Sequence, residues 1–199
     1  MDTRNSMLLA NMMMKEKVEE IPLTKVGTPT IVDGVVSGFS TSDYLIFDNL
    51  NLTDFEICFK FKISSSSYNS IVFNFGNSDE TSRICCQVNT DRTLWCIIRP
   101  NGSSDQLSIT TTSTINLDTY YYIKYTFINK YATVLLSPDN INWTLIGNSQ
   151  LNTSFQSMSY NCIGSRYNGV DRYFRGSIDL NPNSSYIIKN GKKYIYLLP

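Results

Sequence analysis

The chain contains 199 residues, of which 42% are hydrophobic and 17% are charged. This length is enough for one sizeable hydrophobic core, so we expect one domain with a short leader. Seventeen basic and seventeen acidic residues cancel. Because no net field draws in phosphate backbones or anionic lipid, the composition argues against nucleic acid and against membranes as partners.

Asn, Ser, Thr and Tyr dominate the sequence, whereas alanine occurs only twice, at Ala10 and Ala132. These residue types favour strands and polar turns over helices. The composition therefore predicts an all-β protein.

Residues 7–14 form a short apolar run of Met, Leu and Ala interrupted by Asn11. The run lacks a small-residue cleavage site and is too short to span a bilayer, so it predicts neither export nor membrane insertion. On a helix its apolar side chains would surround the axis, and beyond Lys15 only a narrow apolar stripe would continue. Pro22 would end this helix at Ile21.

We expect residues 1–21 to be a helical anchor, residues 22–30 a linker and residues 31–199 the sandwich domain. A helix of about fifteen residues is marginal alone in water, so its order would come from a partner. The alternative is that it packs on the sandwich of its own chain. The sandwich should fold without the anchor. The anchor contacts would be made by Met7, Leu8, Leu9, Met12, Met13, Met14, Val18 and Ile21.

Residues 55–63 carry the clearest strand pattern, because apolar side chains alternate with polar ones or Cys58 over the whole segment. Glu56 would point outward and pair with a neighbouring lysine. In residues 120–128, the inward set would be Tyr121, Ile123, Tyr125 and Phe127. Further strand patterns occupy residues 71–75, 83–88, 94–98, 132–136, 143–146, 158–163 and 173–180.

Asn190-Gly191 lies between two short strand patterns and predicts a type I′ hairpin. About a dozen strands with no helical period between them indicate a sandwich or a barrel. The predicted fold is an antiparallel jelly-roll β-sandwich with a short N-terminal α-helix.

The order of these elements resembles the concanavalin A-like lectin and glucanase jelly roll, in its laminin-G branch. The resemblance spans about residues 27–197, in the segments DGVVSGFSTSDYLIF, FEICFKFKI, YYYIKYTF, VLLSPDNINWTLIG, YFRGSIDL and SYIIKNGKKYIY. The closing RGSIDL strand with its hairpin, and the leader RNSMLLANMMM, are similar to small structural proteins of tailed bacteriophages, including the crAss-like group.

Glycan hydrolases of this fold use a Glu-x-Asp-x-x-Glu carboxylate pair on one strand. That motif is absent here, and the chain contains no histidine to act as a base. We therefore expect no enzyme activity and assign no catalytic residue. The only glutamates are Glu16, Glu19, Glu20, Glu56 and Glu80.

The five cysteines form no CxxC pair, so they predict no zinc site. Cys85 and Cys86 are adjacent and should point to opposite faces of one strand. We expect all five thiols to be reduced. The cysteines are Cys58, Cys85, Cys86, Cys96 and Cys162.

No cofactor is predicted, although the resemblance leaves a structural calcium ion open. None of the candidate oxygens lies in a dense run of ligands, and Asp139 is better explained as a turn former that bonds its own backbone. The candidates are Asp79, Glu80, Asp91, Asp139 and Asp171.

Aromatic and polar side chains that suit a sugar ring occur in the loop of residues 166–172 and at Trp143. The alternatives are that Trp143 packs across its hairpin and that the basic side chains pair with a neighbouring subunit. The candidate glycan-binding residues are Arg166, Tyr167, Asp171, Arg172 and Trp143.

The leading hypothesis is a non-enzymatic virion protein, such as a head fibre, capsid decoration or tail fibre, assembled in the bacterial host cytoplasm. It would dock on other virion proteins through its helix, form a homo-oligomer such as a trimer, and display a sandwich that contacts host or mucosal glycans. The alternative is a carbohydrate-binding module of a bacterial surface or secreted system.

Overall fold

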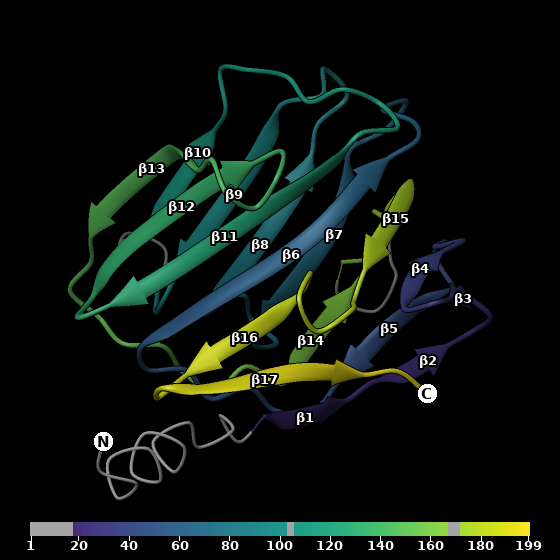
Figure 1. Ribbon diagram of the computed structural model, residues 1–199. Helices are drawn as coiled ribbons and strands as arrows, with labels where there is room; N and C mark the ends of the chain where they lie inside the picture. The colour runs from purple at the N-terminus through teal and green to yellow at the C-terminus, as the bar shows by residue number, and fades with distance from the viewer. Residues whose placement is uncertain (1–17, 103–105, 167–171) are drawn as a thin grey trace, which may run out of the picture.

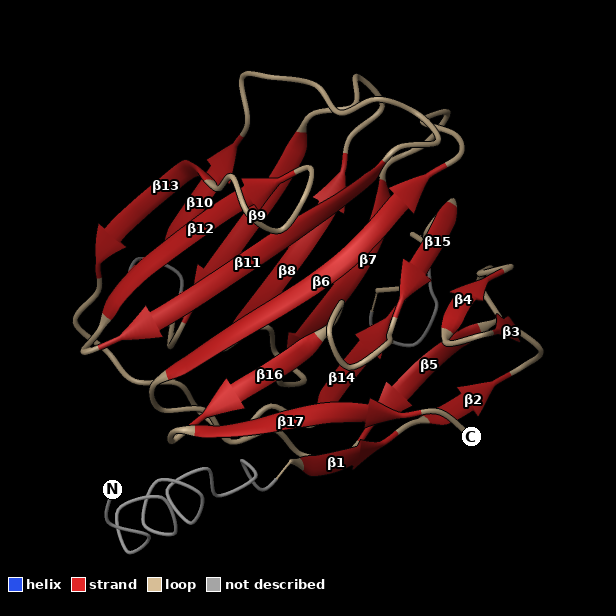
Figure 2. Cartoon of the chain, in the orientation of Figure 1, coloured by secondary structure: helices blue, strands red, loops and turns tan. Residues whose placement is uncertain are grey.

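The computed structural model describes residues 18–102, 106–166 and 172–199. All regular structure in these residues is β-strand, and seventeen strands form two packed sheets (Figure 2). The all-β sandwich predicted from the sequence is therefore confirmed. Within these ranges, no helix is both long enough and apolar enough to cross a membrane.

The larger sheet has ten strands and lies nearer the viewer in Figure 1. Its strands are β1 (Glu19–Pro22), β3 (Thr30–Val32), β4 (Val35–Ser37), β6 (Phe55–Ile63), β11 (Tyr120–Ile128), β12 (Tyr131–Ser137), β13 (Thr144–Gln150), β15 (Gly176–Asp179), β16 (Tyr186–Lys189) and β17 (Lys192–Leu197). The main order is β1-β17-β16-β6-β11-β12-β13, and β15 extends the sheet from β6 through β4 to β3. One edge of β6 pairs with β11, while β15 and β16 share its other edge.

The smaller sheet has seven strands in the order β10-β9-β8-β7-β14-β5-β2, and all its pairs are antiparallel. Its strands are β2 (Thr24–Val26), β5 (Tyr44–Phe47), β7 (Ser70–Gly76), β8 (Arg83–Val88), β9 (Leu94–Arg99), β10 (Leu107–Thr110) and β14 (Tyr160–Ile163). The strands β7 to β10 follow one another along both chain and sheet. Their outward face carries the site described below.

The hydrophobic core between the sheets is rich in aromatic rings. Phe59 of β6 stacks on Phe73 of β7, with ring centres 4.6 Å apart. Tyr125 of β11 meets Phe73 edge-on and donates its hydroxyl to the backbone oxygen of Cys85 over 2.8 Å. Each fully buried side chain of this size contributes about 1.5–3 kcal/mol. The core thus holds together two sheets that share no strand.

The alternating patterns place their side chains as predicted. On β6 the five alternating apolar residues are all buried, whereas Glu56 points outward and pairs with Lys124 at 3.2 Å. On β11 the inward set is confirmed, with Tyr121 packed at the margin of the core. Asn190 and Gly191 have φ values of 51° and 71°, as a type I′ turn requires, so the hairpin is confirmed.

The segment just before Leu23 differs from the expectation, because the predicted helix does not continue through Ile21. Residues Glu19–Pro22 form β1, which pairs in parallel with β17 (Figure 1). Ile21 packs against the core of its own chain, and Val18 is exposed just before the strand. These two predicted anchor residues therefore do not belong to an apolar helix. The other predicted anchor residues, between Met7 and Met14, lie outside the described residues.

Tertiary pairing explains this difference. The β16–β17 hairpin would otherwise leave the edge of β17 open, and β1 satisfies its backbone groups. The edge continues at Leu23, whose N–H donates to the oxygen of Leu197 over 2.9 Å. The predicted linker of residues 22–30 likewise contains β2, which pairs with β5. Strand pairing thus overrides the local helical pattern.

Candidate functional site

The outward face of the seven-stranded sheet combines polar side chains with a small apolar cluster. Cys86 of β8 points into the main core and its neighbour Cys85 points outward, as the sequence predicted. Cys85 packs with Ile71 and Ile97, and Trp95 borders the group. Burial raises the pKa of the Cys85 thiol, so this side chain is a packing element and not a reactive thiolate.

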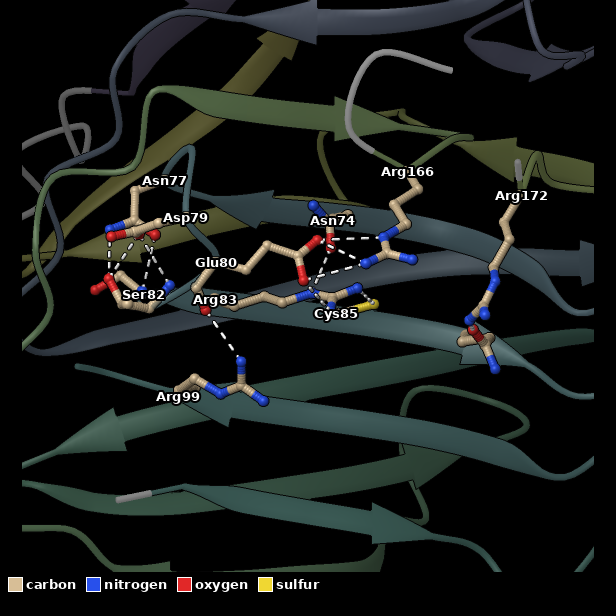
Figure 3. Close-up of polar contacts among 12 residues, drawn as sticks. Asn74, Asn77, Asp79, Glu80, Ser82, Arg83, Cys85, Arg99, Arg166 and Arg172 are labelled. Atoms are coloured by element: carbon tan, nitrogen blue, oxygen red, sulfur yellow. Dashed lines mark hydrogen bonds and ion pairs between the residues drawn. The ribbon is translucent and has the colours of Figure 1, made fainter. Parts of the chain in front are cut away.

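Three arginines contact Glu80 over this face, and a fourth, Arg172, bonds to Gln87 on the same sheet. We call this set the arginine face: Arg83, Arg99, Arg166, Arg172 and Glu80. Figure 3 shows Arg83 and Arg166 converging on the Glu80 carboxylate. Nη2 of Arg166 lies 2.9 Å from Oε1, and Nη1 of Arg83 lies 3.0 Å from Oε2. Arg99 donates from Nη1 to the backbone oxygen of Glu80 over 3.0 Å. Glu80 thus links three of these arginines to one another.

Arg83 anchors the arginine face to the sheet, since it is only 4% exposed. Its Nε atom donates to Oδ1 of Asn74 on the adjacent strand β7 over 2.7 Å. Its guanidinium carbon lies 5.8 Å from the ring centre of Trp95 on β9. A buried guanidinium needs a carboxylate partner, because an unpaired buried charge is costly. Glu80 supplies that partner.

Arg166 and Arg172 lie opposite each other at the base of the loop that the sequence singled out. The N–H of Arg166 donates to the oxygen of Arg172 over 3.0 Å, and Ser165 forms a β-bridge with Tyr173. Arg172 donates from Nη1 to Oε1 of Gln87 on β8 over 2.6 Å. The structure therefore brings these two predicted residues together over the seven-stranded sheet. Tyr167 and Asp171 lie outside the described residues.

Trp143, the remaining predicted glycan-binding residue, does not lie near Arg166 and Arg172. It directly precedes β13 in the ten-stranded sheet, and the Nζ atom of Lys124 on β11 lies 4.4 Å from its ring centre. Lys124 also pairs with Glu56, which accepts a hydrogen bond from the Tyr186 hydroxyl over 2.7 Å. The predicted set is thus divided between the two sheets, and Trp143 does not join Arg166 and Arg172.

A second feature adjoins the arginine face along the chain. Phe174 follows Arg172 by two residues and is buried, with an edge-on contact to Phe61 of β6. Tyr173 is half-buried and packs at the margin of the core, and Arg175 is half-buried beside it. These two side chains line an open hollow of about 250 Å³ together with Tyr68 and Asn69. We call this hollow the tyrosine pocket.

Arg175 is held in a fixed position at the tyrosine pocket. Its guanidinium carbon lies 4.5 Å from the ring centre of Tyr68 and 4.9 Å from that of Tyr173. It donates from Nη2 to the Tyr173 hydroxyl over 2.7 Å and from Nη1 to the Ser67 hydroxyl over 3.3 Å. Tyr68 nevertheless stays 64% exposed, so most of its ring is open to a ligand.

Sequence reasoning missed Tyr68, Tyr173 and Arg175. Tyr68 lies at the end of a serine-rich loop, and a lone aromatic residue in such a loop was the one available signal. Tyr173 and Arg175 were part of a strand pattern, with nothing local to place them beside residue 68.

The candidate calcium ligands mostly bond their own turns. The side-chain and backbone groups of Thr81 donate to Asp79, and those of Thr93 donate to Asp91. Asp139 accepts the backbone N–H groups of Asn142 and Ile141, as predicted for a turn former, and these bonds hold its pKa well below the ordinary value. Across the described part of the chain, no group of three or more acidic or cysteine side chains could hold a metal ion.

A larger hollow, of about 390 Å³, lies near the edge strands β10 and β13. Threonine and aliphatic side chains make up most of its lining, and no lining side chain is charged. Tyr121 is its one aromatic residue and is half-buried, with its hydroxyl accepting the N–H of Asn116. The tyrosine pocket is smaller but offers two rings, an arginine and an amide.

Comparisons with known proteins identify the fold but not the family. No protein-family model matches the sequence, and no curated protein matches it in sequence. Among solved structures, domain 4 of AbnA, a GH43 extracellular arabinanase from Geobacillus stearothermophilus in complex with arabinotriose, is 17% identical with a TM-score of 0.57. The match covers 79% of this chain and 78% of that domain.

Two further structures have the same fold. Mouse laminin α1 domains LG4-5 are 9% identical with a TM-score of 0.55, over 91% of this chain but 47% of the laminin chain. The chain thus spans about half the length of that laminin fragment. The CBM40 of Ruminococcus gnavus IT-sialidase, bound to α2,3 sialyllactose, is 13% identical with a TM-score of 0.53, over 65% and 74% of the two chains. The chain therefore shares its β-sandwich fold with these laminin-G domains and carbohydrate-binding domains, which agrees with the concanavalin A-like fold that the resemblance predicted.

Proposed function

We propose that this protein is a non-enzymatic glycan-binding domain whose sugar site is the tyrosine pocket. The observation that carries the proposal is the exposed ring of Tyr68 beside Tyr173 and Arg175 in an open hollow. The apolar face of a sugar ring packs on an aromatic ring, while its oxygens bond to fixed donors. Arg175 and Asn69 provide such donors at the same hollow.

Two arginines of the arginine face hold the segment that comes just before this pocket in the sequence. Arg172 is tied to Gln87, and Arg166 to Glu80, on either side of the bridge between Ser165 and Tyr173. These contacts fix the backbone on which Tyr173 and Arg175 are carried. A site that is already ordered loses less entropy when a ligand binds.

Two observations favour binding over hydrolysis. Glu56 lies on β6 and Glu80 lies in the loop between β7 and β8 of the other sheet, and each is engaged in an ion pair. The likeness of fold to an arabinotriose-bound domain and to a sialyllactose-bound module supports the same interpretation.

We further propose that the domain is displayed on a virion as a head fibre, capsid decoration or tail fibre, and that it assembles in the bacterial cytoplasm. This setting rests on the sequence resemblance and on the apolar run of residues 7–14. The sandwich would be joined to that segment through β1, which lies at the lower edge in Figure 1, far from the end of β6 that leads to Tyr68. None of the five cysteines forms a disulfide, which suits assembly in a reducing compartment.

A carbohydrate-binding module of a secreted or surface system is the alternative setting, favoured by the likeness of fold to a domain of an extracellular arabinanase. Mass spectrometry of purified phage particles separates the two settings. Peptides of this chain in the particles support the virion role, and their presence only in bacterial surface or culture fractions supports the alternative.

A glycan array tests the binding function. The full chain should bind at least one glycan class, and Tyr68→Ala should reduce that signal about tenfold, the loss expected when one stacking contact disappears. Tyr131→Ala is the matched control, because Tyr131 is also an exposed tyrosine but lies on β12 and does not line the pocket. Absence of any binding by the full chain, or equal losses in both variants, would refute the proposed site.

A further inference from the structure

Unlike Arg83 and Arg166, which pair with Glu80, Arg175 has no carboxylate partner among the described residues. Its side-chain partners are the Tyr173 and Ser67 hydroxyls and the two tyrosine rings. In the described ranges, no Asp or Glu oxygen lies within 4.0 Å of its nitrogens. A guanidinium group has five N–H donors, and these hydroxyls occupy two of them. The remaining donors are available to a ligand in the tyrosine pocket.

Two described carboxylates are engaged elsewhere. Glu80 of the arginine face pairs with Arg83 and Arg166. Asp91 follows Thr90, whose N–H donates to Asn69 of the pocket, and it is held in its own turn by Thr93. The pocket therefore presents a fixed, half-buried cation that no carboxylate of the described residues neutralises.

We infer that the ligand of the tyrosine pocket is a glycan bearing a carboxylate, of the uronic acid or sialic acid type. The inference rests on the proposed glycan-binding function and specifies its ligand class. The carboxylate would accept hydrogen bonds from the open donors of Arg175, and the sugar ring would lie on Tyr68. A carboxylate matches the planar guanidinium with two parallel bonds, whereas a neutral hydroxyl leaves the charge uncompensated.

Calorimetric titration of the full chain with matched pairs of sugars tests this inference. Trigalacturonic acid and sialyllactose are each compared with their methyl esters, so that the two sources of carboxylate are distinguished. One acid should bind at least about tenfold more tightly than its uncharged counterpart, the difference expected for a charge-assisted pair. Its affinity should fall as salt is raised from low to physiological levels.

Three variants test which residue produces the preference for the acidic sugar. Arg175→Gln should bring the Kd of the acid to that of its neutral counterpart, whereas Tyr68→Ala should weaken both ligands. Lys189→Gln removes the same charge from the far end of β16, which does not line the pocket, and should leave both affinities unchanged. Circular dichroism spectra and melting temperatures of all variants establish that each one is folded.

The possible failures are distinguishable. If neutral and acidic sugars bind equally well and both need Tyr68, the ligand class is wrong and the glycan-binding function stands. If no sugar binds, the proposed function fails as well. Retention of the acid preference in Arg175→Gln overturns the role of Arg175. Binding of poly-L-glutamate as tight as that of trigalacturonic acid overturns the requirement for a sugar ring.

Discussion

The Nη1 atom of Arg83 lies 3.0 Å from Oε2 of Glu80, and this pair joins a buried cation to a carboxylate at the surface. Glu80→Gln would leave the guanidinium group without a charged partner. We expect the free energy of unfolding to fall by about 1–3 kcal/mol, as for the loss of hydrogen bonds to a charged group. Denaturant titration measures this change.

Glu19→Gln is the matched control for Glu80. Its partner Lys192 is exposed, and exposed ion pairs contribute little. The same titration should detect almost no change in this variant. If both variants lose the same free energy, the arginine face has no special structural role.

The stability of the sandwich should depend on pH through Asp179. Burial raises the pKa of its carboxyl group, but hydrogen bonds from Lys60, Asn181 and Ser184 outweigh that effect and leave it below the ordinary value. The stabilisation is therefore complete above about pH 4, the pKa of an unfolded Asp, and is lost as pH falls through the lower folded value.

Asp179→Asn should lower the free energy of unfolding at pH 7 by about 2 kcal/mol, and the difference from the natural chain should shrink in acid. Asp48→Asn, at an exposed carboxylate, serves as the control. Urea denaturation from pH 7 to pH 2.5 measures both. A difference that stays constant over this range would mean that Asp179 does not titrate at a depressed pKa.

Two truncations separate the leader from the sheet. Deleting residues 1–17 removes no described strand, so the melting temperature should change by no more than about 1 °C, while incorporation into particles should be lost. Deleting residues 1–22 also removes β1 and uncovers the edge of β17. A loss of about 1–2 kcal/mol corresponds to several degrees in a chain of this size. Equal melting temperatures would show that β1 contributes nothing.

All five cysteines should resist modification in the folded protein. Each is buried, and burial raises the pKa of Cys58 to about 12, which suppresses its reactive thiolate. A thiol-reactive disulfide at pH 8 should label few native molecules within minutes and all five thiols in denaturant. Rapid labelling of the native chain would contradict the burial of these residues.

Much of the fold follows from local patterns. The alternation along β6 and β11 and the Asn190-Gly191 turn required only a period of two and a pair of left-handed residues. Residues 18–21 also fit a helical stripe, and only the distant edge of β17 decides that Glu19–Pro22 is a strand. No local pattern carries that information.

The site was predicted only where its residues are close in sequence. Arg166 and Arg172 belong to one loop, so composition could select both. Tyr68 and Arg175 are brought together because the segment entering β15 runs beside the end of β6, where the N–H of Ser64 donates to the oxygen of Arg175. Residue type alone grouped Trp143 with the loop of residues 166–172. In the structure it lies beside Lys124 on the ten-stranded sheet.

A crystal structure of the full chain with its bound glycan tests the central claim most directly. The account predicts that the sugar ring lies on Tyr68 in the tyrosine pocket and that its polar groups bond to Arg175. A glycan found instead in the hollow beside β10 and β13, or on Trp143 of the ten-stranded sheet, would contradict it.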